Sequence, residues 1–300
     1  MPIRTGTALD HVALFDELLS FLQSDSDGPS WTLLRENSAG DSALFMAPGL
    51  AATDEIYIGV NLTADAGADT FAIGFWMFKD YNAALEDDEQ PGASIVCYMP
   101  VWDDAMPFWF VANGQRLIVT AKVSTVYTAA YAGKFFPDGL PSEYPMPYYV
   151  GSCATAASTR WSSTSESVRN PWDPGLAARV LLPSGQWRTV CNFYDDAGAE
   201  RGNTDSHYIW PFYSGISGSG VRTRYRELRE NLDGSYSLLP LILHGDNPQS
   251  DMLGALDGVY AVPAFSAATE DTVTVSGVQH LLVQNVYRTA RYYYGAIALE

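Results

Sequence analysis

The most constraining feature of this sequence is the stretch 107–151, which begins as two apolar runs separated by a tight-turn dipeptide. Residues 108–111 are aromatic or branched, and residues 117–126 are rich in β-branched side chains. Between them lies Asn113-Gly114, the dipeptide best suited to a type I′ turn, because both central positions of that turn need a positive φ. The pattern predicts a β-hairpin with Asn113-Gly114 at its tip.

The second part of the same stretch, residues 135–149, contains four prolines and five tyrosines or phenylalanines without periodic spacing. Prolines this close together exclude a helix, because each lacks a backbone N–H and clashes with the preceding turn. We therefore expect an ordered loop that covers an apolar surface. Its tyrosines, Tyr144, Tyr148 and Tyr149, are candidate interface residues, because aromatic side chains are enriched where proteins meet.

The clearest predicted helix covers residues 7–23. Apolar side chains between Leu14 and Leu22 recur with helical spacing and form one stripe. Thr7 or Asp10 can cap the start of this helix with a side-chain oxygen. A segment rich in serine and aspartate, closed by Gly-Pro, follows the stripe and ends the helix.

The other apolar runs have the length and composition of β-strands. They cover residues 31–35, 42–47, 54–60, 71–78, 179–182, 187–190, 236–243, 272–283 and 292–299. Turn-forming residues accompany them at 183–186, 231–235, 256–259 and Ser276-Gly277. We predict an α+β fold that is mainly β: an N-terminal helix followed by hairpin-rich antiparallel sheets, sandwich- or barrel-like.

One segment, residues 152–171, is rich in serine and threonine and has few large side chains. Such a composition is typical of a loop or linker. We predict an acidic α+β domain with the central hairpin at 1–151, the linker at 152–171 and a mainly β domain at 172–300.

The charge of the chain is acidic and unevenly distributed. The formal net charge is −18, and residues 1–110 hold 18 acidic against 3 basic residues, a net of −15. Such acidity opposes direct nucleic-acid binding. Arg222, Arg224 and Arg226 alternate in a way that places them on one face of a strand. We predict that this arginine strand contacts protein rather than DNA, either the acidic surface of another copy or a different partner.

The residues that could carry chemistry form no recognisable site. The acidic run 86–89 lacks the spacing of a calcium loop and is expected to be a solvated loop. Adjacent acids at Asp103-Asp104 point in opposite directions on an extended chain, so they cannot share a proton. Four scattered histidines accompany no nucleophile or metal motif. We therefore expect no enzyme activity, no cofactor and no metal.

Three cysteines lie far apart, without metal-ligand spacing, and are expected to be buried reduced thiols. No run is long and apolar enough to span a membrane, and the N-terminus lacks a signal-peptide pattern. We expect synthesis in the cytoplasm and no membrane partner.

Four segments carry a resemblance to a known family: residues 107–152, 231–265, 270–300 and 47–60, the last reading APGLAATDEIYIGV. In texture they resemble structural proteins of tailed-bacteriophage virions. The resemblance implies a tail, baseplate or neck subunit located in the virion, with copies of itself and other virion proteins as partners. It implies no catalytic residues.

Two alternatives remain open at this point. One is a receptor- or glycan-binding module at the tail tip, in which exposed aromatics of residues 144–149, or Trp161 and Trp172, stack against sugars. The other, which the motifs do not favour, is a virion-associated hydrolase.

Overall fold

The computed structural model describes residues 2–165, 167–192, 207–211, 237–245, 252–263, 267–287 and 294–299. Within them the fold is mainly β, and the strand pairs are antiparallel. One α-helix, α1 (His11–Gln23), lies in the described part of the chain, so the α component of the predicted α+β class is small. The predicted antiparallel, mainly β architecture is confirmed.

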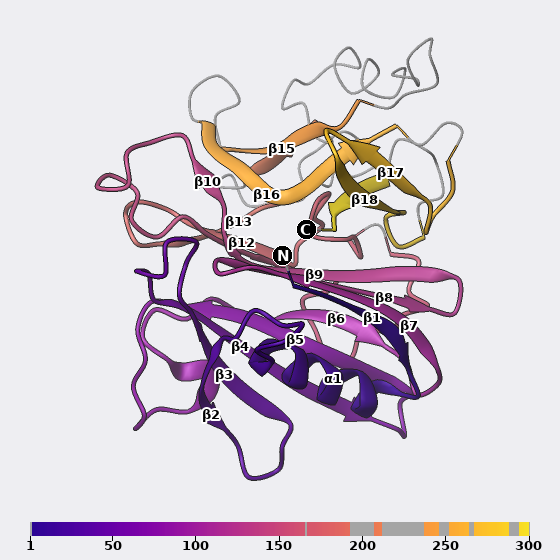
Figure 1. The fold of residues 1–300 in the computed structure, drawn as a ribbon. Coiled ribbons are helices and arrows are strands. Elements are labelled where there is room, and N and C mark those ends of the chain that lie inside the picture. The colour runs from indigo at the N-terminus through magenta and orange to yellow at the C-terminus, as the bar shows by residue number, and fades with distance from the viewer. Residues whose placement is uncertain are drawn as a thin grey trace.

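The strands form three sheets that are stacked in layers (Figure 1). Sheet A, in the middle, has the order β1 (Ile3–Ala8), β7 (Met106–Ala112), β8 (Arg116–Val123), β9 (Val126–Lys134), β11 (Tyr148–Gly151), β12 (Ala178–Leu181), β13 (Trp187–Thr189). Sheet B, below it, has the order β2 (Thr32–Glu36), β3 (Ser42–Ala47), β4 (Ile56–Asp65), β5 (Thr70–Phe78), β6 (Cys97–Val101). Sheet C, above it, has the order β14 (Tyr208–Trp210), β15 (Leu239–His244), β16 (Met252–Val262), β19 (Tyr294–Ala298), β18 (Val278–Val283), β17 (Thr272–Val275), and β10 (Phe136–Pro137) pairs with β16.

Sheet A is buried on both faces. In β8, Leu117 and Val119 belong to the lower core, which sheet A shares with sheet B and α1, whereas Ile118 belongs to the upper core, which it shares with sheet C. Tyr148 and Tyr149 of β11 divide in the same way. Successive side chains of a strand point to opposite faces, so a strand inside a three-layer stack must be apolar at nearly every position.

Helix α1 fills the space between sheets A and B (Figure 1). Leu14, Leu18 and Leu22, the predicted apolar stripe, have no exposed surface. The side chain of Asp10 accepts a hydrogen bond from the Ala13 backbone N–H at 2.7 Å, which confirms one of the two predicted caps. The predicted start at residue 7 is wrong, because residues 3–8 pair with β7 as an edge strand of sheet A.

The predicted hairpin of 107–151 forms between β7 and β8, but its tip differs from the expected type I′ turn. Neither Asn113 nor Gly114 has a positive φ. Instead the Asn113 side chain accepts hydrogen bonds from the backbone N–H groups of Gln115 and Arg116. Gly114 is required for another reason: a Cβ there would lie 2.2 Å from the carbonyl oxygen of Gly49.

A second tight hairpin follows directly. The run 117–126 does not form one strand, because the chain reverses between β8 and β9, with Ser124 at φ 57°. β-Branched and apolar residues continue through the reversal, so the sequence pattern does not mark it. Similarly, residues 256–259 are not a turn between strands: they lie inside β16, where the pairing with β15 shifts register.

Most other predicted elements are confirmed where the chain is described. The hairpins β12–β13 and β17–β18 form as expected, and Ser276 and Gly277 both have positive φ at the second tip. The turn 231–235 lies outside the described residues. The division at 152–171 stays a prediction, although sheet A contains strands from both sides of that segment, because β11 pairs with β12.

A largely buried carboxylate links sheet C to sheet A. Asp257, in the irregular part of β16, accepts hydrogen bonds from the side chains of Asn113 at 3.1 Å and Gln115 at 3.0 Å. Its Oδ2 also lies 2.9 Å from Nε of Arg116, whose side chain is 1% exposed. The guanidinium rests over Gly258, which has φ +72° and where a Cβ would lie 2.1 Å from the Arg116 Nη2.

We expect Gly258→Ala to lower the free energy of unfolding by about 2–5 kcal/mol, combining left-handed strain of about 1–2 kcal/mol with overpacking of about 1–3 kcal/mol. Gly277→Ala is the matched control, because Gly277 has φ +87° and no heavy atom within 4 Å of the added Cβ. Urea denaturation of the two variants measures the difference. Equal losses would show that the contact with Arg116 contributes nothing.

Candidate functional site

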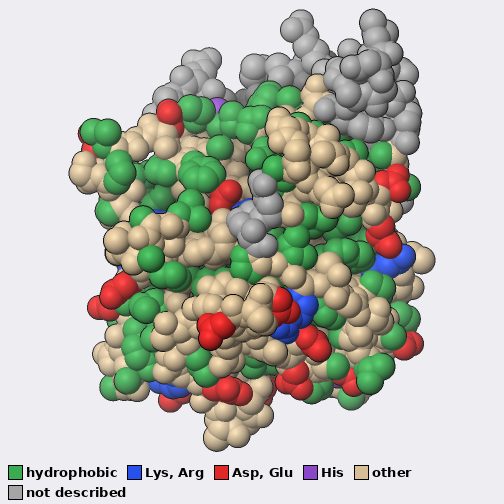
Figure 2. Space-filling model, in the orientation of Figure 1, with side chains coloured by type: hydrophobic (Ala, Val, Ile, Leu, Met, Phe, Trp, Pro, Cys, Tyr) green, Lys and Arg blue, Asp and Glu red, His purple; other side chains and the backbone are tan. Residues whose placement is uncertain are grey.

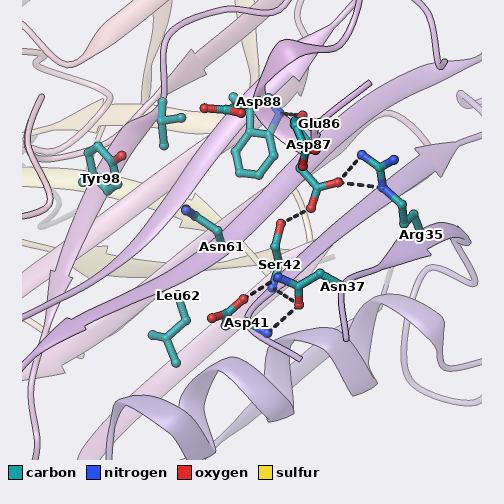
Figure 3. A pocket seen from close by; sticks show the side chains of 12 residues that line it. Arg35, Asn37, Asp41, Ser42, Asn61, Leu62, Glu86, Asp87, Asp88 and Tyr98 are labelled. Carbon is teal, nitrogen blue, oxygen red and sulfur yellow. Dashed lines mark hydrogen bonds and ion pairs between the residues drawn. The ribbon is translucent and has the colours of Figure 1, made fainter. Parts of the chain in front are cut away.

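A polar pocket lies on the outer face of sheet B (Figure 3). Its floor is one row of residues across four paired strands: Ser42, Asn61, Gly74 and Tyr98. Because these residues are direct cross-strand neighbours, their side chains share one face of the sheet. In Figure 3, Asn61 lies between Tyr98 and Ser42. We call this the sheet B pocket.

Gly74 lets neighbouring side chains pack closely over the middle of this row. A Cβ at this position would lie 2.1 Å from the Asn61 Oδ1 and 2.6 Å from the Val96 Cγ1. The side chains of Asn61 and Val96 therefore occupy the space that a larger residue at position 74 would need. The Oδ1 of Asn61 is buried there and has no hydrogen-bond partner. A buried acceptor of this kind costs free energy, because it has lost its hydrogen bond to water.

The wall of the pocket is the acidic segment 86–89, which contains the short 3-10 helix η1 (Asp87–Glu89). Arg35 of β2 holds this wall in place: its Nε donates to Asp87 Oδ1 at 2.7 Å, and its Nη2 donates to the Leu85 carbonyl at 2.8 Å. The hydroxyl of Ser42 donates to the other oxygen of Asp87, and Trp76 Nε1 donates to the Asp87 carbonyl at 3.0 Å. The wall is thus fixed to the sheet by polar contacts.

The expectation of a solvated loop at 86–89 is wrong for Asp87, whose carboxylate is half-buried and bound at both oxygens. It holds for Glu86, Asp88 and Glu89, which are exposed. The sequence could not reveal this, because Arg35 is 52 residues from Asp87 and only the sheet brings them together.

The described residues contain no group of three or more His, Cys, Asp or Glu side chains that could hold a metal ion. One acid–histidine contact forms: His11 Nδ1 lies 3.2 Å from Asp103 Oδ1, and the imidazole lies against the Phe71 ring at 4.3 Å. No hydroxyl or thiol is bonded to His11 in the described part of the chain. The contact therefore joins the start of α1 to the loop before β7 without forming a nucleophile–base pair.

The three candidate interface tyrosines lie inside the fold. Tyr144, Tyr148 and Tyr149 are 6%, 1% and 0% exposed. Their hydroxyls donate to backbone carbonyls: Tyr144 to Leu181 at 2.5 Å, Tyr148 to Glu55 at 3.1 Å, and Tyr149 to Pro171. Burial raises the pKa of all three phenols. Their assignment to an interface between subunits gains no support from the described fold.

The other predicted contact residues either lie outside the described residues or pack against other parts of the chain. Arg222, Arg224 and Arg226 lie outside the described residues, so the arginine strand stays a prediction. Trp172 is 1% exposed, and Trp161 packs against Trp102 with ring centroids 5.2 Å apart. The aromatics considered for sugar stacking are therefore largely used inside the chain.

The segment 135–149 does present apolar surface, but through residues that the sequence analysis did not select. Phe136 is 50% exposed and Leu140 is 63% exposed. They lie beside β16, because β10 pairs with it and the Asp138 N–H donates to the Leu253 carbonyl at 3.0 Å; Met252, next along the chain, is 45% exposed. We call these three side chains the β10 flank. Figure 2 shows hydrophobic side chains at the surface on this side of the molecule.

No protein-family model matches the chain, and no curated protein is significantly similar to it in sequence. Roles for individual residues must therefore be argued from the contacts described above. In the described part of the chain, no helix is long and apolar enough to cross a membrane.

The three cysteines are buried and free, as expected. Burial raises the pKa of both the Cys97 and the Cys153 thiol to about 12. The thiolate is the reactive form of cysteine. We therefore expect iodoacetamide to alkylate almost no Cys97 or Cys153 in the native protein at a pH of about 8.5, the ordinary pKa of a thiol. In urea all three thiols should react. Mass spectrometry counts the adducts, and rapid native labelling of Cys97 or Cys153 would contradict the described burial.

Proposed function

We propose that this chain is a structural subunit of a tailed-phage virion, a tail, baseplate or neck component that acts through contacts with copies of itself and with other virion proteins. The single observation that carries the proposal is the β10 flank. Three large apolar side chains, Phe136, Leu140 and Met252, are exposed on two neighbouring segments, the chain around β10 and the start of β16, which pair with each other. Clustered apolar surface of this kind marks protein contact sites.

The β10 flank is held in a defined conformation. Tyr144 bonds to the Leu181 carbonyl, and its ring meets Phe135 edge-on at 5.6 Å. The pairing of β10 with β16 fixes the other end of the segment. A preorganised surface loses little conformational entropy when a partner covers it, which favours association.

Charge adds a second, weaker argument. The first 110 residues hold a net charge of −15, and in Figure 2 acidic side chains are frequent over the lower layer. We propose that this acidic surface meets a basic one, either the arginine strand Arg222, Arg224 and Arg226 of another copy or another virion protein. Exposed ion pairs each contribute only about 0–1 kcal/mol and are screened by salt, so they would steer assembly rather than hold it.

The decisive experiment is to look for the protein in purified particles. We expect mass spectrometry to find it in multiple copies per particle and immunogold labelling to place it on the tail or at one of its ends. Recovery from infected-cell lysate alone, with none in particles, would overturn the proposal.

The β10 flank gives a sharper prediction for the purified chain. Phe136→Ser combined with Leu140→Ser should weaken self-association or association with a virion partner, because it removes most of the exposed apolar area of the flank. Leu9→Ser is the control, since Leu9 is 78% exposed but lies at the start of α1, away from the flank. Light scattering measures oligomer size. Unfolding curves should stay within about 0.5 kcal/mol, as for ordinary surface changes.

If the double variant at Phe136 and Leu140 assembles like the unchanged protein, the β10 flank is not the contact surface and the structural proposal loses its main support.

A further inference from the structure

We propose that the outer edge of β1 pairs with β1 of a second copy of this chain, antiparallel, so that sheet A continues through a two-fold dimer. This contact goes beyond the proposed function, because it holds whether or not the protein belongs to a virion. Three observations carry it: a row of unpaired backbone groups, an edge without the usual protection, and a register in which that edge complements itself.

The backbone groups of every second residue of β1 point away from sheet A. The Ala112 N–H donates to the Pro2 carbonyl at 3.2 Å, in the register that continues along β1 and β7. Hydrogen-bonded and non-hydrogen-bonded pairs alternate along antiparallel strands. Arg4 and Gly6 therefore bond to β7, whereas the N–H and C=O groups at residues 3, 5 and 7 point outward.

These outward groups have no partner in the described chain. No described hydrogen bond involves the backbone of Ile3, Thr5 or Thr7 on the outer side of β1. Thr5 and Thr7 are exposed, since α1 packs beneath β1 and β7 and β1 is the border strand of the middle layer (Figure 1). A row of unpaired N–H and C=O groups at the border of a sheet is ready to pair with another strand.

The other border strands of the described sheets are protected. Both β13 and β14 have three residues, and β17 has four. In β2 the register shifts between Leu33 and Arg35, and in β6 the backbone of Tyr98 exchanges hydrogen bonds with Ala154. Short strands, irregular pairing and covering segments are the devices by which proteins prevent edge-to-edge pairing.

The edge of β1 lacks these devices. Its six residues pair with β7 in unbroken register. Arg4 carries the one charge of the strand, and its guanidinium is bound to Glu17 and Asp27 of the same chain. Among the described border strands, β1 is therefore the one best suited to pair with a further strand.

A second copy matches this edge in length and register. The outward groups are symmetric about Thr5, so a two-fold axis at Thr5 places Thr5 opposite itself and Ile3 opposite Thr7. Each such pair exchanges both of its hydrogen bonds, and no outward group is left over. The same register places Arg4 opposite Gly6, so like charges do not face each other directly. Two-fold contacts of this self-complementary kind are the commonest in protein oligomers.

Charge separates this contact from the acidic–basic contact of the proposed function. Each copy has a formal net charge of −18, so two copies repel and backbone pairing must hold them together. Salt screens the repulsion. The β1 dimer should therefore become tighter as ionic strength rises, whereas a contact between acidic residues and the arginine strand should become weaker.

Sedimentation of the full chain over a concentration series, combined with amide hydrogen exchange, tests the proposal. We expect a dimer that forms with increasing concentration. The N–H groups of Thr5 and Thr7 should exchange fast in the monomer and slowly in the dimer. Those of Arg4 and Gly6 should be slow in both, because they already bond to β7.

Matched variants separate the backbone from the side chain. Thr5→Pro should raise the dissociation constant about tenfold or more, because the two-fold axis removes one N–H from each copy and leaves both acceptors unpaired. The pairing with β7 should survive, since the Thr5 N–H points outward and an edge strand tolerates proline there. Thr5→Val is the control: it keeps the N–H and the branched side chain, and should dimerise like the unchanged protein.

A charge pair tests the register and controls for folding. Thr5→Lys and Thr5→Glu should each raise the dissociation constant about two- to fivefold, because like charges then meet across the axis. An equimolar mixture of the two variants should dimerise at least as well as the unchanged protein. Recovery in the mixture shows that both variants fold.

Several results would overturn the proposal: no dimer at any concentration, a dimer in which the Thr5 and Thr7 amides still exchange fast, equal dissociation constants for Thr5→Pro and Thr5→Val, or no recovery in the Lys and Glu mixture. Protection of these amides only after another protein is added would assign the edge to that protein instead. A β1 dimer that persists in the double serine variant at Phe136 and Leu140 would uphold this proposal even where the β10 flank fails.

Discussion

Burial of sheet A on both faces is the constraint on which the rest of the structure depends. A sheet covered on one side can alternate apolar and polar residues, but β8 and β9 have cores above and below and carry apolar side chains on both faces. The two outer layers exist to cover those faces: sheet B with α1 on one side and sheet C on the other (Figure 1). Removing either layer would expose a full sheet face to water.

Apolar contact alone does not fix how the layers are registered, and buried polar links supply that specificity. Asp257 of sheet C is bound by Asn113, Gln115 and Arg116 at one hairpin tip of sheet A. At another point Asp173 binds both Arg169 and Asn285. Breaking one partner of such a buried group leaves the other unsatisfied, so these links penalise any slipped arrangement of the sheets.

The β10 flank and the sheet B pocket present different kinds of surface and lie on different layers. The β10 flank offers apolar area, which gives affinity without strong direction, whereas the sheet B pocket presents charged and polar groups, which contribute more to specificity. A subunit that joins several neighbours needs both kinds of surface. On the outer face of sheet B, Arg35 secures the acidic wall through Asp87.

Local pattern in the sequence was sufficient for the mainly β class, for most strands, for the apolar stripe of α1 and its Asp10 cap, and for the turns at Ser276-Gly277 and Gly185. These depend on residues within a few positions of one another. The tertiary structure alone decided which strands pair, that Tyr144 and Tyr149 point inward while Phe136 points outward, and that Arg35 meets Asp87. Such contacts join residues far apart in the chain, and no local periodicity encodes which distant face a side chain will meet.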